Sequence, residues 1–273
     1  SLLPAGWSRF LLRGAGAAAA RGRFLRAGLV KRQLGMVFPA AGPAELERLT
    51  RAVYDHLART AAEVLLDDPR RLERSVEVRP GWGALDAALA RGRGVIAATG
   101  HIGNFELGGR VLARRHPVLD VVKPQRNPHF DRYMDRLRRR HGIRTVPVDG
   151  SGPAVLAHLR EGGVVTLLID QDAGKNGLRT EFLGHPASSW PGAARISLRT
   201  GCPVLPMAIV REDGGRHVLH LGDPLDPADH RGTPDEVRSY TAAISAAVEK
   251  YIRARPGQWF WVHRRWKGAH EAG

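Results

Sequence analysis

The sequence predicts an α/β fold in which a mostly parallel central sheet is flanked by helices. Short apolar runs alternate along the chain with stretches whose apolar residues recur at helical spacing. Strands that are separated by helices in this way usually pair in parallel within an open sheet. The expected strands span residues 94–99, 118–122, 164–169 and 204–210, and the expected helices span residues 44–66, 104–115, 131–140, 154–161 and 192–200.

Each element has its own signal, taken in chain order. The stretch 44–66 (AELERLTRAVYDHLARTAAEVLL) has apolar residues at helical spacing and predicts a long helix. The stretch 94–99 (GVIAAT) is short and apolar, and the residues that follow it, 104–115, have a helical pattern. The later apolar runs have the length of buried strands, and helical patterns separate them. Ligands of such sheets bind outside the carboxyl ends of the strands, which is where His101 falls.

Composition indicates one globular domain covering residues 1–273. Hydrophobic residues make up 43% and charged residues 25%, which is ordinary for a folded protein, and a chain of 273 residues without repeats fits one large domain. The one cysteine, Cys202, excludes an internal disulfide framework and a multi-thiolate zinc site, and it suits a reducing compartment. The net charge of +15 favours an anionic partner, although an arginine-rich composition alone would also produce it.

Residues 1–38 contain no acidic residue and form a segment distinct from the body at 39–273. Basic residues alternate there with aromatic and aliphatic ones, and no apolar run approaches the roughly 20 residues that a membrane span needs. We therefore expect a basic amphipathic helical segment that lies on an anionic membrane surface. An equally good alternative is a helix that packs on the body and turns its arginines to solvent.

The stretch 98–109 (ATGHIGNFELGG) carries the clearest chemical signal. His101 and Glu106 are five residues apart, so they meet only if the chain bends between them. Gly103 permits a bend and Asn104 is a favoured N-cap, which would place Glu106 in the first helical turn. A carboxylate on one imidazole nitrogen would leave the other free to take a proton from a substrate hydroxyl. Alternatively, Glu106 simply favours the helix dipole and His101 is an ordinary loop residue.

Five blocks resemble the bacterial lipid A biosynthesis acyltransferases, to which phosphatidylinositol mannoside acyltransferases are related. GHIGNFE is similar to the family signature GHxGNWE, with Phe105 where tryptophan is frequent. The blocks occur in the family's order from about residue 32 to residue 267. The other four are KPQRNPHFDRYMDRLRRRHG (123–142), LLIDQDAGKNG (167–177), FLGHPASSWPGAARISLRTGCPVLP (182–206) and PGQWFWVHRRWK (256–267).

The resemblance implies a glycerolipid acyltransferase-like fold and a set of site residues. It identifies His101 and Glu106 as a catalytic dyad, and it marks Arg138 and Asp170 as needed for activity. For Asp170 we expect a structural or orienting role through a salt bridge to a nearby arginine. The resemblance implies no metal and no cofactor besides the acyl thioester. The residues expected at the substrate are Asn104, Lys123, Arg126, Arg138 and Asp170.

The aromatic residues near the C-terminus allow two interpretations. Trp259, Phe260, Trp261 and Trp266 lie beside basic residues and would suit a membrane-facing edge. We expect at least half of these rings to pack in the core instead.

The expected function is acyl transfer at a membrane. The donor would be an acyl carrier protein or coenzyme A thioester, and the acceptor would be a hydroxyl of a lipid A precursor or a related glycolipid. The protein would lie peripherally on the cytoplasmic face of the bacterial inner membrane, with no nucleic-acid partner. Two alternatives remain: a basic nucleic-acid-binding protein, and a metal-dependent ester hydrolase that uses His101, Asp170 and Asp172.

Overall fold

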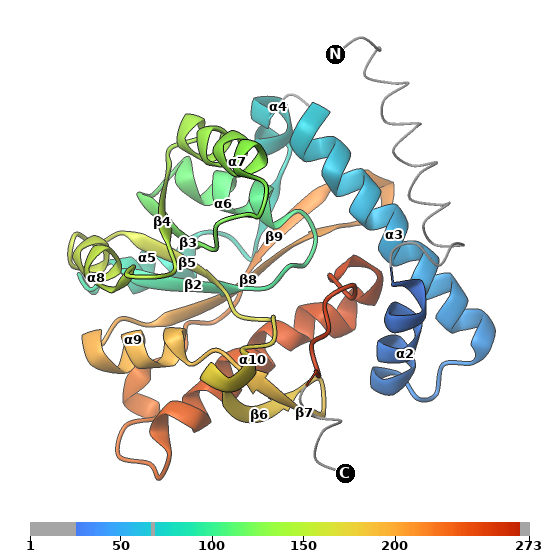
Figure 1. The fold of residues 1–273 in the computed structure, drawn as a ribbon. Coiled ribbons are helices and arrows are strands. Elements are labelled where there is room, and N and C mark those ends of the chain that lie inside the picture. Colours follow the sequence, from blue (N-terminus) through green and yellow to red (C-terminus); the bar gives the residue numbers. More distant parts are fainter. Residues whose placement is uncertain (1–25, 67–68, 268–273) are drawn as a thin grey trace.

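A seven-stranded sheet forms the centre of the molecule in the computed structural model, which describes residues 26–66 and 69–267 (Figure 1). The strand order is β1-β9-β8-β2-β5-β3-β4, and neighbouring strands are parallel except for the antiparallel pair β8 and β9. The predicted mostly parallel sheet is therefore confirmed. The strands are β1 (Glu77–Arg79), β2 (Val95–Thr99), β3 (Val118–Val122), β4 (Ile143–Pro147), β5 (Val164–Leu168), β8 (Val204–Arg211) and β9 (His217–Leu221).

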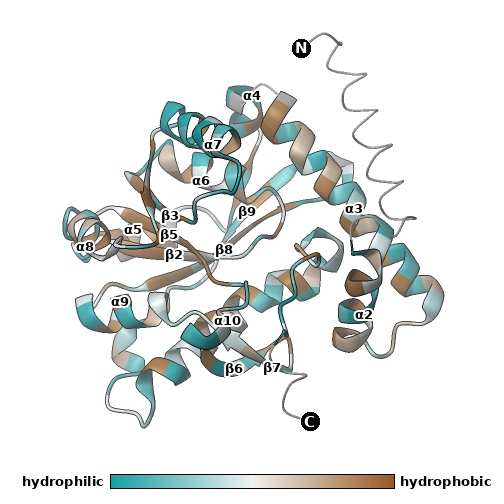
Figure 2. Ribbon diagram, in the orientation of Figure 1, coloured by the Kyte–Doolittle hydropathy of each residue, from teal (hydrophilic) through white to brown (hydrophobic). Residues whose placement is uncertain are grey.

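Helices cover both faces of the sheet because the strand residues alternate in direction. On β2, Val95 and Ala97 pack with α5 (Gly83–Leu89) and α6 (Phe105–Ala113). Ile96 and Ala98 point the other way and pack with α8 (Gly152–Arg160), α9 (Gly192–Thr200) and α10 (Glu236–Ala254). Figure 2 shows the strands mostly brown between helices of mixed colour, as expected for strands that are buried on both faces.

All nine predicted elements are present, with ends that shift by a few residues. The helix expected at 44–66 is α3 (Pro43–Leu66), and the one expected at 131–140 is α7 (Pro128–Arg140). Elements that were not predicted include β4, β9, α10 and the antiparallel hairpin of β6 (Leu178–Phe182) and β7 (His185–Ser189). Another element that was not predicted is the short helix α4 (Pro69–Arg74), whereas α2 (Ala27–Val37) lies within the helical segment expected at residues 1–38.

A third hydrophobic cluster lies beyond the sheet and joins α2, α3, the β6–β7 hairpin and the C-terminal segment. Trp259, Trp261 and Trp266 are buried in it, and Trp259 packs against Trp261 with ring centroids 4.6 Å apart. The expectation that at least half of these rings pack in the core is confirmed, and these three do not form a membrane-facing edge. Their indole nitrogens all find protein acceptors, as buried tryptophans usually do.

The end of the basic N-terminal segment packs on the body. Val30 and Leu34 of α2 are fully buried, and the Gln33 amide donates to the backbone oxygens of Trp261 and His263 at 2.7 and 2.9 Å. For residues 26–38 the packed helix is therefore the correct alternative, because its apolar stripe meets the tryptophan cluster. Residues 1–25, the rest of the predicted membrane-interface segment, lie outside the described residues.

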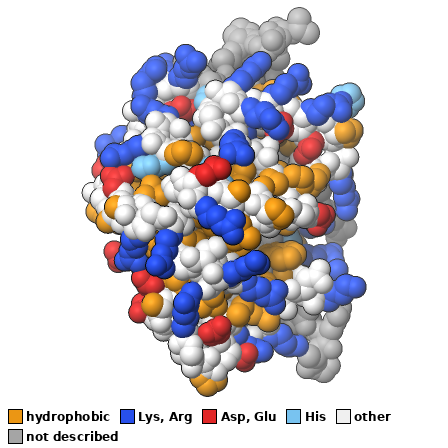
Figure 3. Space-filling model, turned by 90° about the vertical axis from the view of Figure 1, so that its left-hand side faces the viewer, with side chains coloured by type: hydrophobic (Ala, Val, Ile, Leu, Met, Phe, Trp, Pro, Cys, Tyr) orange, Lys and Arg blue, Asp and Glu red, His pale blue; other side chains and the backbone are white. Residues whose placement is uncertain are grey.

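The positive charge is spread widely over the surface. Figure 3 shows the face at the left of Figure 1, where lysine and arginine side chains are scattered among apolar ones and acidic side chains are fewer. None of the described helices has both the length and the apolar character needed to cross a bilayer.

Candidate active site

His101 and Asp170 are neighbours because β2 and β5 are parallel and in register. Thr99 pairs with Leu168 at the ends of the two strands, so the residues two positions further along each chain emerge side by side. The His101 ring Nδ1 lies 2.8 Å from Asp170 Oδ1, and the His101 backbone nitrogen donates to Oδ2 at 2.7 Å. An ionised carboxylate only accepts, so Nδ1 carries the hydrogen and Nε2 keeps its lone pair.

Asp170 is a buried anion that the protein itself stabilises. Its side chain is 1% exposed, and besides His101 it accepts a hydrogen bond from Trp259 Nε1 at 2.7 Å. Burial alone would raise the pKa of Asp170, but the His101 ring and the hydrogen bonds from His101 and Trp259 lower it to about 2. The expected arginine partner of Asp170 is corrected, because its oxygens accept from His101 and Trp259, while its expected substrate contact stays a prediction.

Glu106 binds Arg138, and this corrects the expectation that it braces His101. Arg138 of α7 donates to the Glu106 carboxylate through Nη2 at 2.5 Å and Nε at 3.1 Å. The fork geometry of a guanidinium explains this two-point contact. Asp120 on β3 has its Oδ2 3.9 Å from Arg138 Nε. Burial raises the pKa of Asp120 to about 6, and the nearby Glu106 charge adds to this effect. The three side chains form an ionic cluster next to the His101 loop.

The loop that carries His101 requires glycine at its tightest point. Gly103 has a φ of +60°, and a Cβ there would lie 1.5 Å from the backbone oxygen of Ile209. The C-terminal segment holds the same loop from the other side. The Gly103 nitrogen donates to the Gln258 backbone oxygen at 2.9 Å, and the Phe260 nitrogen donates to the His101 oxygen at 3.1 Å.

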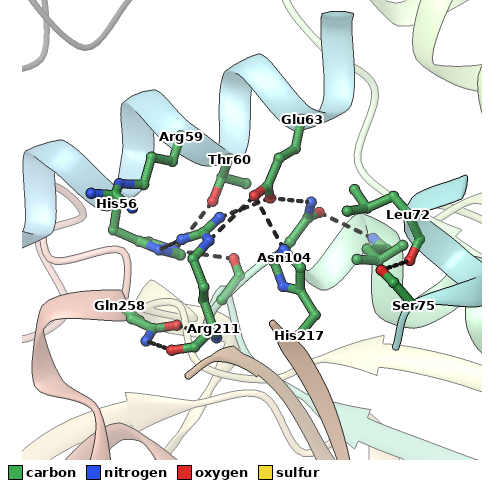
Figure 4. A network of polar contacts seen from close by, with 12 residues as sticks. His56, Arg59, Thr60, Glu63, Leu72, Ser75, Asn104, Arg211, His217 and Gln258 are labelled. Carbon is green, nitrogen blue, oxygen red and sulfur yellow. Dashed lines mark hydrogen bonds and ion pairs between the residues drawn. The ribbon is translucent and has the colours of Figure 1, made fainter. Parts of the chain in front are cut away.

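Asn104 connects the loop to a buried polar network on α3 (Figure 4). Its side-chain oxygen accepts from the Leu107 nitrogen at 3.1 Å and caps α6, as predicted, while its amide nitrogen donates to Glu63 at 2.9 Å. Glu63 also accepts from Arg211 at 2.7 and 3.2 Å and from His217 at 3.1 Å. Asn104 is buried and both ends of its amide make hydrogen bonds within the protein, so it positions the loop, and its expected substrate contact stays a prediction.

His56 adds a second tie between α3 and the loop. Its Nε2 lies 3.2 Å from the Gly103 oxygen, so it must donate there, and its Nδ1 accepts from Arg211 at 2.8 Å. This pattern requires a neutral ring. Burial, reinforced by the nearby Arg211 charge, lowers the pKa of His56 to about 3.

The free side of His101 opens toward solvent between two aromatic rings. Its side chain is 21% exposed, and the Phe105 and Phe260 rings lie 5.0 and 5.9 Å from the imidazole. The Gln171 amide nitrogen is 3.3 Å from Nε2. A lone pair on Nε2, next to the half-buried side-chain amide of Gln171, suits proton abstraction from a bound hydroxyl.

No hydrogen bond joins the remaining predicted residues to His101 within the described part of the chain. Lys123 and Arg126 are exposed in the loop between β3 and α7. The backbone nitrogen of Asp172 donates to His263 Nε2 at 2.9 Å. Within residues 26–66 and 69–267, no group of three or more His, Cys, Asp or Glu side chains is arranged to hold a metal ion. The donor set of the metal-dependent hydrolase is therefore not assembled in this part of the chain.

Comparison with known proteins identifies the family. The sequence profile described as bacterial lipid A biosynthesis acyltransferase matches residues 1–268. This chain belongs to that family. Among its relatives, the phosphatidylinositol mannoside acyltransferase of Mycobacterium tuberculosis (strain CDC 1551 / Oshkosh) is 28% identical over 84% of this chain and 72% of that one. The lipid A biosynthesis palmitoleoyltransferase of Escherichia coli (strain K12) is 24% identical over 89% of this chain and 79% of that one.

Two further similarities of this lipid A-type acyltransferase are to a lauroyltransferase and to one solved structure. The Escherichia coli (strain K12) lipid A biosynthesis lauroyltransferase is 24% identical over 93% of this chain and 83% of that one. The crystal structure of the 1-acyl-sn-glycerophosphate acyltransferase PlsC from Thermotoga maritima covers 94% of this chain and 99% of that one, with 16% identity and a TM-score of 0.42. The family assignment does not rest on that structural likeness.

Sequence reasoning missed four residues that hold the acyltransferase site together: Glu63, His56, Arg211 and Gln258. Glu63 and His56 are seven residues apart in the predicted helix 44–66, and therefore lie on one face of it. Two polar residues on the face that meets the sheet are the signal that could have found them.

Proposed function

We propose that this acyltransferase moves a fatty acyl chain from an acyl thioester to a hydroxyl of a lipid, with His101 as the general base. The observation that carries the proposal is the pairing of His101 Nδ1 with the buried Asp170 carboxylate, which leaves the lone pair on Nε2, where only the Gln171 amide approaches it among the described residues. A histidine held this way has a fixed tautomer, and its protonated form is stabilised by the neighbouring anion.

In the proposed step, His101 Nε2 takes the proton of the acceptor hydroxyl while the hydroxyl oxygen attacks the thioester carbonyl carbon. The tetrahedral intermediate then collapses, the C–S bond breaks and an ester remains. The proton on Nε2 passes to the leaving thiolate. Asp170 stays ionised throughout and stabilises the imidazolium, a role consistent with its lowered pKa. General base catalysis of this kind contributes about 10²–10⁴-fold.

Gln171 is the proposed donor to the developing oxyanion. Its amide nitrogen lies 3.3 Å from His101 Nε2, so it is within reach of a carbonyl that is attacked by a hydroxyl bound there. When the acceptor hydroxyl replaces the Gln171 amide at His101 Nε2, the amide becomes free to donate to the carbonyl oxygen of the thioester. Loss of such a donor costs about 10²–10³-fold in kcat.

Glu106 has a proposed role through Arg138. The Glu106 carboxylate fixes the Arg138 guanidinium beside the His101 loop. Arg138, together with Lys123 and Arg126, would offer positive charge to the phosphate or carboxylate groups of a substrate. Coenzyme A, the acyl carrier protein and anionic lipids all carry such groups. The net charge of +15 would attract each of them to the protein.

The proposed acceptor is a lipid A precursor or a related glycolipid. The named relatives support this class, since they include two lipid A acyltransferases and a phosphatidylinositol mannoside acyltransferase. An enzyme acting on such a lipid would work peripherally at the cytoplasmic face of the bacterial inner membrane.

Mass spectrometry of the product tests the proposal. The purified chain is incubated with isotope-labelled acyl coenzyme A or acyl carrier protein, extracted bacterial lipids and a chelator. We expect a lipid that gains one labelled acyl ester, formed by wild type and by Asp172→Asn but not by His101→Gln. Release of free fatty acid with no acylated lipid, or transfer that stops when the chelator is added, would contradict the proposal.

A further inference from the structure

Gln33 interrupts the apolar stripe by which α2 packs on the body. The buried residues of this helix are Val30, Gln33, Leu34 and Val37, and Gln33 is 6% exposed. Their spacing of three and four residues is that of one helix face. Burial of an amide is unfavourable unless the amide is hydrogen-bonded, so packing of the stripe alone does not explain a glutamine at this position.

The Gln33 amide binds the backbone of the C-terminal segment, defined as residues 256–267. Its nitrogen donates to the oxygens of Trp261 and His263 at 2.7 and 2.9 Å. Its oxygen accepts from the Arg265 nitrogen at 3.2 Å. This part of the segment belongs to no helix or strand, so its backbone groups depend on partners from elsewhere. Figure 1 shows the segment, in red, between α2 and the central sheet.

The C-terminal segment also forms one wall of the loop after β2. Trp259 makes an isolated antiparallel bridge with Ile102. The Phe260 nitrogen donates to the His101 oxygen at 3.1 Å. The position of the imidazole therefore depends on where this segment lies.

The same segment holds the loop after β5. Trp259 Nε1 donates to Asp170 Oδ2 at 2.7 Å, and His263 Nε2 accepts from the Asp172 nitrogen at 2.9 Å. Gln171, the proposed oxyanion donor, lies between these two contacts in the chain. One segment thus contacts the loop of the proposed base, its orienting acid and the loop of the proposed oxyanion donor.

Other contacts attach the C-terminal segment without Gln33. The Arg265 guanidinium donates to the Ser189 hydroxyl at 2.7 Å. The exposed Arg26 donates to the Val262 oxygen at 3.1 Å. We therefore expect the segment to stay attached when Gln33 is replaced, but to be displaced at the active site.

We propose that Gln33 is a positioning residue for acyl transfer, which acts through the C-terminal segment to keep His101 and Asp170 in place. Its three hydrogen bonds end on the backbone of the segment, just beyond the residues that contact the imidazole and the carboxylate. A shift of about 1 Å at a catalytic group can cost roughly 10²-fold in rate. The inference rests on the proposed function, since the groups that are positioned are those proposed for the transfer.

Kinetics and nuclear magnetic resonance of Gln33→Met test the proposal in the full chain. Methionine has a similar length but lacks the amide, so all three hydrogen bonds are lost. We expect kcat for acyl transfer to fall roughly 10²-fold, with the KM for the thioester nearly unchanged. The downfield His101 Nδ1 proton should shift or broaden. Gln33→Asn keeps an amide that is one methylene shorter, so it should show a smaller loss, and it is measured as well in case Gln33→Met does not fold.

Thr50→Val is the matched control. Thr50 is 2% exposed in the neighbouring helix α3, and its hydroxyl donates to the Leu46 oxygen of the same helix at 2.7 Å. The variant loses a buried hydrogen bond that does not involve the C-terminal segment. Its kcat and its His101 proton should therefore match wild type, even if its thermal stability falls.

The outcomes separate positioning from general stability. A folded Gln33→Asn protein with the kcat and the His101 proton of wild type would overturn the inference, as would equal losses in Thr50→Val. If the His101 proton moves only in the Gln33 variants but wild type transfers no acyl group, the positioning of His101 is supported and the proposed function fails.

Discussion

The Asp170 carboxylate holds His101 at two points, the ring Nδ1 at 2.8 Å and the backbone nitrogen at 2.7 Å. One buried anion therefore sets both the tautomer of the imidazole and the path of the loop that carries it. Trp259 Nε1 adds a third contact, which links this pair to the C-terminal segment. The geometry is that of an orienting acid and its base, the acid and base being 69 residues apart in the sequence.

Replacement of Asp170 by asparagine should lower kcat by roughly 10³–10⁴-fold. An amide cannot stabilise the imidazolium, and its NH₂ group would face Nδ1 and favour the wrong tautomer. Steady-state kinetics checks the rate, and near-UV circular dichroism checks that the tryptophan cluster is intact. A natively folded Asp170→Asn enzyme with a kcat close to wild type would contradict this role.

The Glu106–Arg138 pair should contribute to the stability of the folded state as well as to activity. Arg138→Met leaves a buried carboxylate beside Asp120, which should cost about 3–5 kcal/mol of unfolding free energy. Glu106→Gln/Arg138→Met removes both charges and should regain most of that loss. Urea unfolding of the two variants measures the difference. An Arg138→Met protein as stable as wild type would show that the pair is not buried as described.

Gly103 should not tolerate even alanine. A Cβ at this position would overlap the Ile209 oxygen, and the φ of +60° disfavours any L side chain. We expect Gly103→Ala to give little soluble protein. The matched control is Gly192→Ala, at the start of α9, where a Cβ meets nothing within 4 Å. The two variants are compared by their soluble yield and by thermal unfolding. Equal yields and equal unfolding temperatures would refute the close approach of Gly103 to the Ile209 backbone.

The folded state should lose stability in mild acid because His56 must stay neutral. The ring binds a proton near pH 6.5 when unfolded but only near pH 3 when folded, so the free energy of unfolding falls as the pH drops from 6.5 toward 3. The slope from this one group is at most about 1.4 kcal/mol per pH unit.

His56→Gln is the variant that isolates this effect. Its amide can donate to the Gly103 oxygen and accept from Arg211 but does not titrate. Denaturant unfolding at several pH values should give a shallower acid dependence than wild type. Other titrating groups, including Asp120, are present in both proteins and cancel in the comparison. Parallel curves for the two proteins would contradict the assigned pKa of His56.

Local patterns predicted the elements that are buried or strongly periodic. The apolar run VIAAT of β2 and the alternation of strands and helices were sufficient for the parallel sheet. The strand β4 (IRTVP) was missed because it lies at the sheet edge and carries polar residues that interrupt its apolar run. The helix α10 was missed despite apolar residues at helical spacing, namely Val237, Tyr240, Ile244, Val248 and Ile252.

The site was predictable only where its determinants are local in sequence. Gly103 and Asn104 indicated the bend after β2, and the structure confirms both the bend and the cap. The acid that braces His101 was misassigned to Glu106, because the correct partner depends on the register between β2 and β5. Glu63 lies 41 residues before Asn104, and their contact follows from how α3 crosses the sheet edge.

Nuclear magnetic resonance of ¹⁵N-histidine-labelled enzyme tests the central claim most directly, because it observes the His101 Nδ1 proton itself. Spectra are recorded for wild type, Glu106→Gln and Asp170→Asn, with His101→Gln for assignment. We predict a downfield proton on Nδ1 of His101 that persists in Glu106→Gln and disappears in Asp170→Asn. Persistence of that proton in Asp170→Asn, or its loss in Glu106→Gln, would contradict the pairing from which the proposed mechanism is built.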